Sequence, residues 1–194
     1  MTLPRLLLLT DRAQLPAHRT LEDTVSRCVD VGLEAVVVRE LDLPEQRRRK
    51  LVARLAATGV TVIAARTWSP QAAGVHLSAV QTGLDARPAA FHGRSCHDVA
   101  EVRRAVGGGA AYVTISPVAV SWSKPGHGPA IGVEGVRRAA ELAGTAQLFA
   151  LGGVDTHNAA AMRAAGADGV AVMGAVMRAD DPAAVLADLL EQVR

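Results

Sequence analysis

Short apolar runs recur along the chain, and stretches with helical spacing of apolar residues separate most of them. Each run is four to six residues long, which suits a strand buried on both faces better than a helix. Near-continuous apolar strands are typical of parallel sheets, whose two faces are both covered. The predicted strands are residues 5–10, 35–38, 60–64, 74–77, 89–93, 111–116, 148–151 and 169–173.

The segments between these runs predict helices with recognisable ends. Thr20 opens a capping-box pattern, Pro44 begins a second helix, and Asp181-Pro182 begins the last one. Further helices are expected over residues 98–106, 131–142 and 159–165. Residues 67–73 leave room for only a turn of helix, and residues 79–87 for a short helical piece.

Eight strands, each followed by a helix or a shortened substitute, predict one compact (β/α)8 TIM barrel. A barrel more often needs roughly 250 residues, so a chain of 194 residues must abbreviate some helices. No linker-like stretch divides the chain, and we expect a single domain over residues 1–194. A doubly wound open sheet is the alternative, because pattern alone separates the two folds poorly.

The segment over residues 148–176 carries the clearest indication of a ligand. Its two predicted strands end at Gly152-Gly153 and at Gly174, with a helix between them that Asp155 or Thr156 can cap. Backbone N–H groups at glycine can approach an anion with no Cβ in the way. Phosphates in (β/α)8 barrels commonly bind at the loops after the seventh and eighth strands. The sequence therefore predicts a phosphate site here.

Composition excludes several classes of protein. Aromatic residues are only 3% and the net charge is +2, which argues against nucleic acid as a partner. The basic run Arg47–Lys50 falls within a helical pattern and is interpreted as a solvated face. Leu6–Leu9 is too short to cross a membrane. Cys28 and Cys96 match no metal spacing, so two reduced thiols and a cytoplasmic location are expected.

Polar residues at the predicted strand ends are the candidates for chemistry, because barrel active sites lie there. Arg39 either pairs with Asp11 or Glu40 or binds an anion. His76 lies within a strand, so it points either into the barrel mouth or at a helix. Lys124 belongs to a Gly/Pro-rich loop of the lid type.

Several segments together resemble the thiamine phosphate synthase family, in that family's order and over nearly the whole chain. The resemblance implies a (β/α)8 barrel whose Gly152, Gly153, Met173 and Gly174 backbones hold the phosphate of a thiazole phosphate. It rests on the pieces Leu9-Thr-Asp-Arg12, Val36-Val-Val-Arg-Glu40, Gly74-Val-His-Leu77, Gly93-Arg-Ser95, Tyr112 to Lys124, Leu151-Gly-Gly-Val154 and Gly166-Ala-Asp-Gly-Val-Ala-Val172.

The chain departs from the synthase pattern at the positions that the family uses for magnesium. The Asn-Asp pair after strand three is replaced by Ala65-Arg66, and the second magnesium-binding Asp aligns with Gln81. The Gln and Lys around the Arg-Glu pair are replaced by Val37 and Leu41. Because a hard cation needs oxygen ligands, we expect no metal cofactor.

A related branch of the family, the thiazole tautomerases, lacks those metal ligands, and Gly93–His97 resembles it closely. A proton-transfer reaction needs a positioned group that titrates near neutrality, which suits histidine. The branch has a histidine after strand six, where this chain has Pro117. By position, His76 and then His97 become the catalytic candidates.

In this interpretation Arg39 and Lys124 hold a substrate carboxylate, and Ser95, Ser121 and Ser123 supply hydrogen bonds. A thiazole tautomerase-like isomerase is thus the first functional hypothesis. Thiamine phosphate synthase and a non-catalytic thiazole- or thiamine-phosphate-binding regulator are the alternatives. The resemblance also allows a homodimer.

Overall fold

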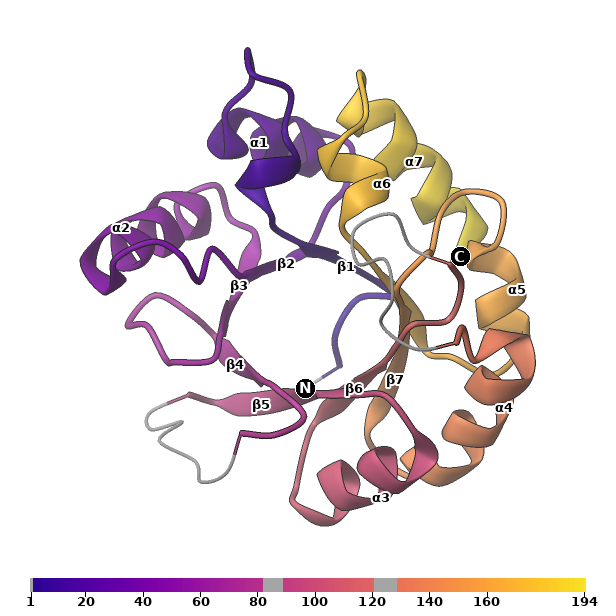
Figure 1. Cartoon of the computed structure of the whole chain (residues 1–194). Coiled ribbons are helices and arrows are strands. Elements are labelled where there is room, and N and C mark those ends of the chain that lie inside the picture. Colours follow the sequence, from indigo (N-terminus) through magenta and orange to yellow (C-terminus); the bar gives the residue numbers. More distant parts are fainter. Residues whose placement is uncertain (1, 82–88, 121–128) are drawn as a thin grey trace.

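The computed structural model describes residues 2–81, 89–120 and 129–194, and its strands close into a barrel (Figure 1). Every strand pairs in parallel with the next, and β1 pairs with β8 through Leu7 and Ala171. This closure excludes the open sheet and confirms the (β/α)8 prediction. The strands are β1 (Leu6–Leu9), β2 (Ala35–Val38), β3 (Thr61–Ala65), β4 (Gly74–Leu77), β5 (Phe91–Cys96), β6 (Tyr112–Ile115), β7 (Gln147–Leu151) and β8 (Gly169–Val172).

Helices surround the strands on the outside of the barrel, as Figure 1 shows. They are η1 (Arg12–Gln14), α1 (Leu21–Asp30), α2 (Glu45–Ala56), α3 (Val99–Gly107), α4 (Gly132–Ala143), α5 (Ala159–Ala164), α6 (Gly174–Met177) and α7 (Pro182–Gln192). The turn of helix expected over residues 67–73 does not form. Most of the short piece expected at 79–87 lies outside the described residues.

Helix starts follow the predicted capping chemistry at Thr20 and Asp181, and α2 begins directly after Pro44. The Thr20 hydroxyl accepts from the Asp23 N–H, and the Asp181 carboxylate accepts from the first turn of α7. The helix predicted over residues 159–165 forms as α5, but its predicted cap was wrong, because Asn158 is the N-cap residue and makes no side-chain cap bond. Asp155 instead accepts from the backbone N–H of His157, so its carboxylate is used in the preceding turn.

Strand β5 differs most from its prediction. It spans Phe91–Cys96 rather than residues 89–93, because its ladder with β6 continues from Gly93 opposite Tyr112 to Cys96 opposite Ile115. Arg94 and Ser95 therefore belong to the strand and not to the following loop. With side chains alternating along a strand, Ser95 faces the barrel interior while Cys96 packs outward among the helices.

Aromatic rings in the barrel interior lie against glycines on neighbouring strands. A Cβ on Gly93 would lie 2.0 Å from the Tyr112 ring, far inside van der Waals contact. Tyr112 and Phe149 meet edge to face with centroids 5.7 Å apart, and both are fully buried. The same pairing of glycine with ring recurs for Gly74 with Phe91 and for Gly169 with Phe149.

Two further features bear on the sequence predictions. Cys28 and Cys96 are free and buried, and burial raises the pKa of each thiol to about 12, which leaves both unreactive near neutral pH.

Within the described part of the chain, no helix has both the length and the apolar character needed to span a membrane.

Candidate functional site

Three polar side chains from neighbouring strands meet inside the barrel. The His76 Nδ1 atom lies 2.8 Å from the Tyr112 hydroxyl, and its Nε2 atom lies 2.8 Å from the Ser95 hydroxyl. Strand alternation places all three on the interior face, so His76 points into the barrel and not at a helix. Of the two orientations open to His76 in the sequence, the structure selects the inward one and joins it to Ser95.

Burial keeps the His76 ring neutral. His76 is 6% exposed, and burial, followed by the charges of Arg39, Arg66 and Arg94, lowers its pKa from 6.5 to about 4. Burial also raises the pKa of Tyr112 well above its ordinary value, so its hydroxyl stays protonated. A neutral imidazole donates through one nitrogen and accepts through the other. The ring therefore links the two hydroxyls at neutral pH and is a weak base.

This environment predicts an acid-sensitive fold. Because the pKa of His76 is lower in the folded than in the unfolded chain, the unfolded state gains protons first as the pH falls below 6.5. Between pH 7.5 and pH 5, the linkage removes about 2 kcal/mol from the free energy of unfolding. His76→Gln should lack this loss, whereas His157→Gln, at an exposed histidine, should keep it. Urea unfolding of the three proteins at both pH values measures the loss of free energy of unfolding. The same loss in all three proteins would contradict the assignment to His76.

His97, the second catalytic candidate, belongs to the start of α3. Its backbone N–H donates to the Glu101 carboxylate, and its Nδ1 atom lies 3.0 Å from the same carboxylate oxygen. The Asp98 side chain accepts in return from the Glu101 N–H, which completes a reciprocal cap. The side chain of His97 is 53% exposed and does not join His76 and Ser95.

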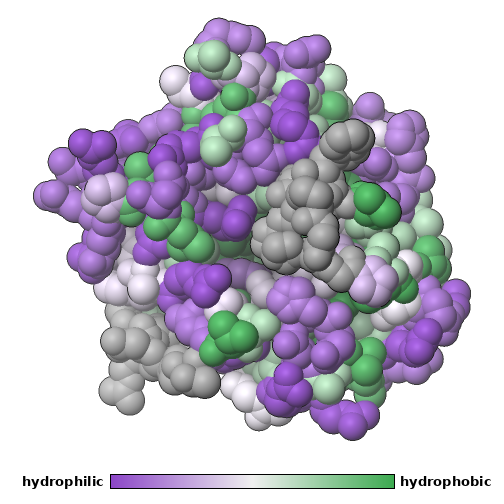
Figure 2. Space-filling model, viewed as in Figure 1, coloured by the Kyte–Doolittle hydropathy of each residue, from purple (hydrophilic) through white to green (hydrophobic). Residues whose placement is uncertain are grey.

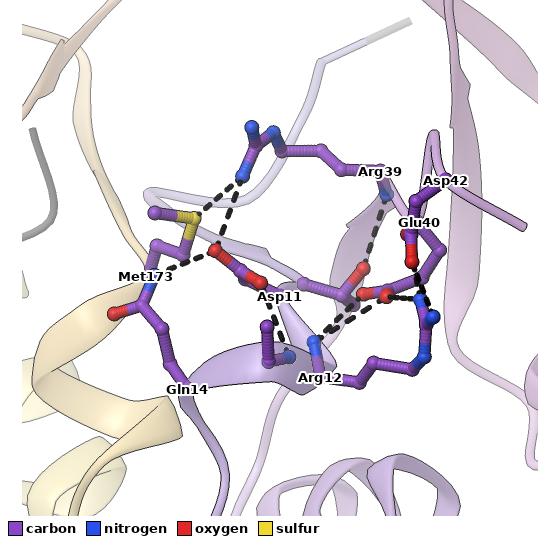
Figure 3. A network of polar contacts seen from close by, with 9 residues as sticks. Asp11, Arg12, Gln14, Arg39, Glu40, Asp42 and Met173 are labelled. Atoms are coloured by element: carbon purple, nitrogen blue, oxygen red, sulfur yellow. Dashed lines mark hydrogen bonds and ion pairs between the residues drawn. The ribbon is translucent and has the colours of Figure 1, made fainter.

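Arg39 extends from the end of β2 across the barrel mouth (Figure 3). Its Nη1 atom lies 2.9 Å from the Met173 sulfur and 3.9 Å from an Asp11 carboxylate oxygen. The Arg39 N–H also donates to the Thr10 hydroxyl, which fixes its backbone. Asp11, and not Glu40, is therefore the intramolecular partner of Arg39. The long distance to Asp11 leaves guanidinium donors for a ligand.

The neighbouring Glu40 is used by Arg12 instead. Glu40 is 4% exposed, and its carboxylate accepts from the Arg12 N–H and from the Arg12 guanidinium at 2.9 Å. Asp42 takes the other side of the same guanidinium (Figure 3), and the two carboxylates raise the pKa of Arg12 further. A buried carboxylate is stable only when paired in this way. This arrangement keeps Glu40 out of the mouth.

The loop after β7 has the left-handed backbone that glycine permits. Gly152 and Gly153 have φ angles of 86° and 76°. The Gly152 carbonyl accepts from the N–H groups of Val118 and Ala119, and the Gly153 carbonyl accepts from the Asn158 side chain. Both carbonyl groups are thus bound to protein. Among the described residues, the Gly153 N–H has no protein acceptor.

The loop after β8 lies next to it. Leu151 is in register with Ala171, so Gly153 and Met173 leave adjacent strands at the same level. The Gly174 N–H likewise has no acceptor in the described ranges. The Arg178 guanidinium lies against Gly174, in the space that a Cβ would need, and it donates to the Gln14 side chain. The predicted phosphate residues are therefore brought together, with a cation beside them.

The two positions that the family resemblance assigns to magnesium carry no carboxylate. Arg66 has a left-handed φ of 71°, and the Gln81 amide donates to the Arg66 carbonyl at 2.7 Å. A guanidinium and an amide locked to the backbone do not suit a hard dication. Within the described ranges, no three His, Cys, Asp or Glu side chains gather in a possible metal cluster.

Some candidates lie outside the described residues, and some site residues were missed. Ser121, Ser123 and Lys124 belong to the first group. Tyr112 and Arg178 belong to the second. Arg178 follows Gly174 by four residues, the spacing that brings side chains onto one helix face, and this signal was available in the sequence. Tyr112 required the register between β4, β5 and β6, which sequence does not reveal.

The closed parallel sheet places the chain in the class of (β/α)8 barrel proteins. Among the described residues, the loops after β7 and β8 carry amides without protein acceptors, at the place where barrels commonly bind phosphate. Comparison with known proteins identifies the family within this class. Residues 6–176 match the family described as thiamine monophosphate synthase, and the chain belongs to that family.

Individual relatives agree with this assignment. The chain is 33% identical to a thiamine-phosphate synthase of Gloeobacter violaceus over 91% of its own length and 55% of the relative's. It is also 33% identical to a thiamine-phosphate synthase of Roseiflexus, over 91% of its own length and 79% of the relative's. A solved thiamine phosphate pyrophosphorylase from Pyrococcus furiosus has the same fold, with a TM-score of 0.84 at 23% identity, over 97% of this chain and 95% of that one.

The chain does not span the full length of most of these relatives. Besides the Gloeobacter protein, three others named for thiamine biosynthesis or thiamine-phosphate synthase are matched over 26%, 60% and 58% of their lengths.

Proposed function

We propose that this chain binds a thiazole phosphate at the barrel mouth and acts in thiamine biosynthesis. The observation that carries the proposal is the juxtaposition of the Gly153 and Gly174 amides, both without protein acceptors in the described ranges, beside the Arg178 guanidinium. Unpaired N–H groups and a guanidinium are the donors that a phosphate monoester requires. Family membership supports the thiazole as the organic part.

The first candidate reaction is the one for which the relatives are named, formation of thiamine phosphate. In this reaction the thiazole nitrogen attacks the methylene carbon of a hydroxymethylpyrimidine diphosphate, and the carbon–oxygen bond to the diphosphate breaks. The electron pair leaves with the diphosphate, whose charge must be neutralised. Arg39 and Arg66 directly follow the ends of β2 and β3, and the charges of both lower the pKa of His76, so they are the candidates to neutralise that charge.

The second candidate is the tautomerase reaction, and the residues Arg66 and Gln81 favour it. With Arg66 and Gln81, the two magnesium positions have no carboxylate, and the tautomerase branch needs none there. Ser95, hydrogen-bonded through His76 to Tyr112, would face the substrate, and its hydroxyl would accept the proton that one substrate position loses as it gives its own proton to the other position. Because the His76 pKa is about 4, His76 serves better to orient Ser95 than to act as the base.

An assay of the purified chain separates these reactions. Thiazole phosphate and the pyrimidine diphosphate are supplied with EDTA and then with increasing magnesium, and thiamine phosphate is followed by chromatography. If arginine neutralises the leaving group, product forms in EDTA and Arg66→Ala lowers kcat by about tenfold or more. Arg103→Ala, at an exposed position on α3, should leave kcat unchanged.

The other outcomes are equally informative. Ring aromatisation of a thiazole carboxylate phosphate, seen as an absorbance change without thiamine phosphate formation, would favour the tautomerase. Thiazole phosphate binding without either reaction would identify a non-catalytic regulator. An absence of thiazole phosphate binding would overturn the proposal.

A further inference from the structure

A groove of about 610 Å³ lies between α1 and α2, bordered by η1 and by the loop before α2, and no described strand residue lines it. Leucines from both helices and their preceding loops line it, among them Leu21 and Leu51, which are buried. Cationic side chains from the same segments complete the lining. Neither His76 nor the glycines after β7 and β8 contribute to it, so this groove is separate from the proposed thiazole phosphate site.

Five cations line the groove, but only one carboxylate does. Arg54 pairs with that carboxylate, Glu22, at 2.6 Å, which joins α2 to α1. Arg12 is held by Glu40 and Asp42. Arg47 and Lys50 have no acidic partner within the described ranges, and Arg19 donates to backbone carbonyls. The cationic residues are Arg12, Arg19, Arg47, Lys50 and Arg54.

Arg47, Arg49 and Lys50 are exposed, as the interpretation of a solvated face predicted, and only the half-buried Arg48 departs from it. Arg48 turns inward and donates to the Ala65 carbonyl, and Arg49 pairs with Glu45 one turn earlier on α2. Arg47 and Lys50, three residues apart on one helix face, line the groove instead. Figure 2 shows mainly hydrophilic residues over α2, with hydrophobic residues among them.

We propose that this groove binds an organic phosphate of about nucleotide size. Its phosphate groups contact Arg47 and Lys50, and its organic part rests on the leucines. The volume falls within the range of about 300–1,000 Å³ typical of small-molecule sites. Two neighbouring cations without counter-ions repel each other, and an anion removes this repulsion. The lining contains no aromatic ring, so a planar base lies on aliphatic side chains and on a guanidinium face.

The test uses the fluorescent nucleotide trinitrophenyl-ADP as the probe, with unlabelled ADP as competitor. The purified wild-type chain is expected to bind it. Arg47→Gln combined with Lys50→Gln should raise the dissociation constant by about tenfold or more, because two charge-assisted hydrogen bonds are lost. The matched control is Arg49→Gln with Arg103→Gln, which removes the same charge outside the groove and should leave the constant within about twofold.

Two further titrations identify the site and the ligand class. Saturating thiazole phosphate should not displace the probe, whatever becomes of the proposed function, whereas displacement would place the nucleotide in the mouth and overturn the inference. Inorganic pyrophosphate should compete more weakly than ADP, because it lacks the organic part. Equal dissociation constants for the two double variants, or an acidic peptide competing as well as ADP, would also overturn it.

Discussion

Replacing Gly93 with alanine is expected to lower the free energy of unfolding by about 3 kcal/mol. The new Cβ would lie 2.0 Å from the ring of Tyr112, and this ring is fully buried. Tyr112 also contacts Phe149 edge to face and carries the hydroxyl that bonds His76. The ring therefore cannot move without disturbing the barrel interior.

Denaturant unfolding of the Gly93→Ala variant measures this loss. Gly107→Ala is the matched control, because a Cβ there meets nothing within 4 Å and the residue ends a helix. It should change stability by no more than about 1 kcal/mol. Combining Gly93→Ala with Tyr112→Leu should cost less than the two changes summed, since the clash is shared. A Gly93→Ala protein as stable as the Gly107→Ala control would show that the interior is not packed as described.

Replacing Gly153 with alanine is expected to weaken thiazole phosphate binding by about tenfold or more, because the loop amide would be displaced. Gly153 has a φ of 76°, and its Cβ would lie 2.6 Å from the carbonyl oxygen of Ala119. That oxygen belongs to the backbone, so a side-chain rotation cannot relieve the contact. Either the loop after β7 or the segment around Ala119 must shift, and both border the mouth.

Calorimetric titration with thiazole phosphate compares this variant with Gly59→Ala. Gly59 also has a left-handed backbone, with a φ of 88°, but a Cβ there meets nothing within 4 Å. The control therefore carries similar backbone strain, of about 1–2 kcal/mol, without the collision. It should lose stability and keep its affinity. Equal affinities for Gly153→Ala and the wild type would remove this loop from the ligand site.

Much of the fold is predictable because its determinants are local. Continuous apolar runs and terminal capping residues such as Thr20 and Asp181 are short-range signals, and they predicted strands and helix starts well. Strand β5 was misplaced because its polar residues are held in the strand by the ladders with β4 and β6. A pairing of this kind depends on a neighbouring strand, so a local pattern does not show it.

The candidate site likewise has features that local sequence predicts and features that depend on packing. Glycines at strand ends predicted the loops after β7 and β8, since a left-handed backbone favours glycine over other residues. The direction of His76 and its bond to Tyr112 depend on strand register, and the groove depends on how α1 packs beside α2. Within the basic run of α2, the inward turn of Arg48 depends on the contact of α2 with the end of β3, whereas the pair of Arg49 with Glu45 follows from helix spacing.

The most direct test of the central proposal is a titration with thiazole phosphate followed by amide proton and nitrogen chemical shifts of the isotopically labelled chain. We expect the largest shifts at the Gly153 and Gly174 amides, with smaller changes at neighbours in the two loops and none on α2. Large shifts confined to other strand ends, with Gly153 and Gly174 unmoved under saturating ligand, would contradict the proposed phosphate site.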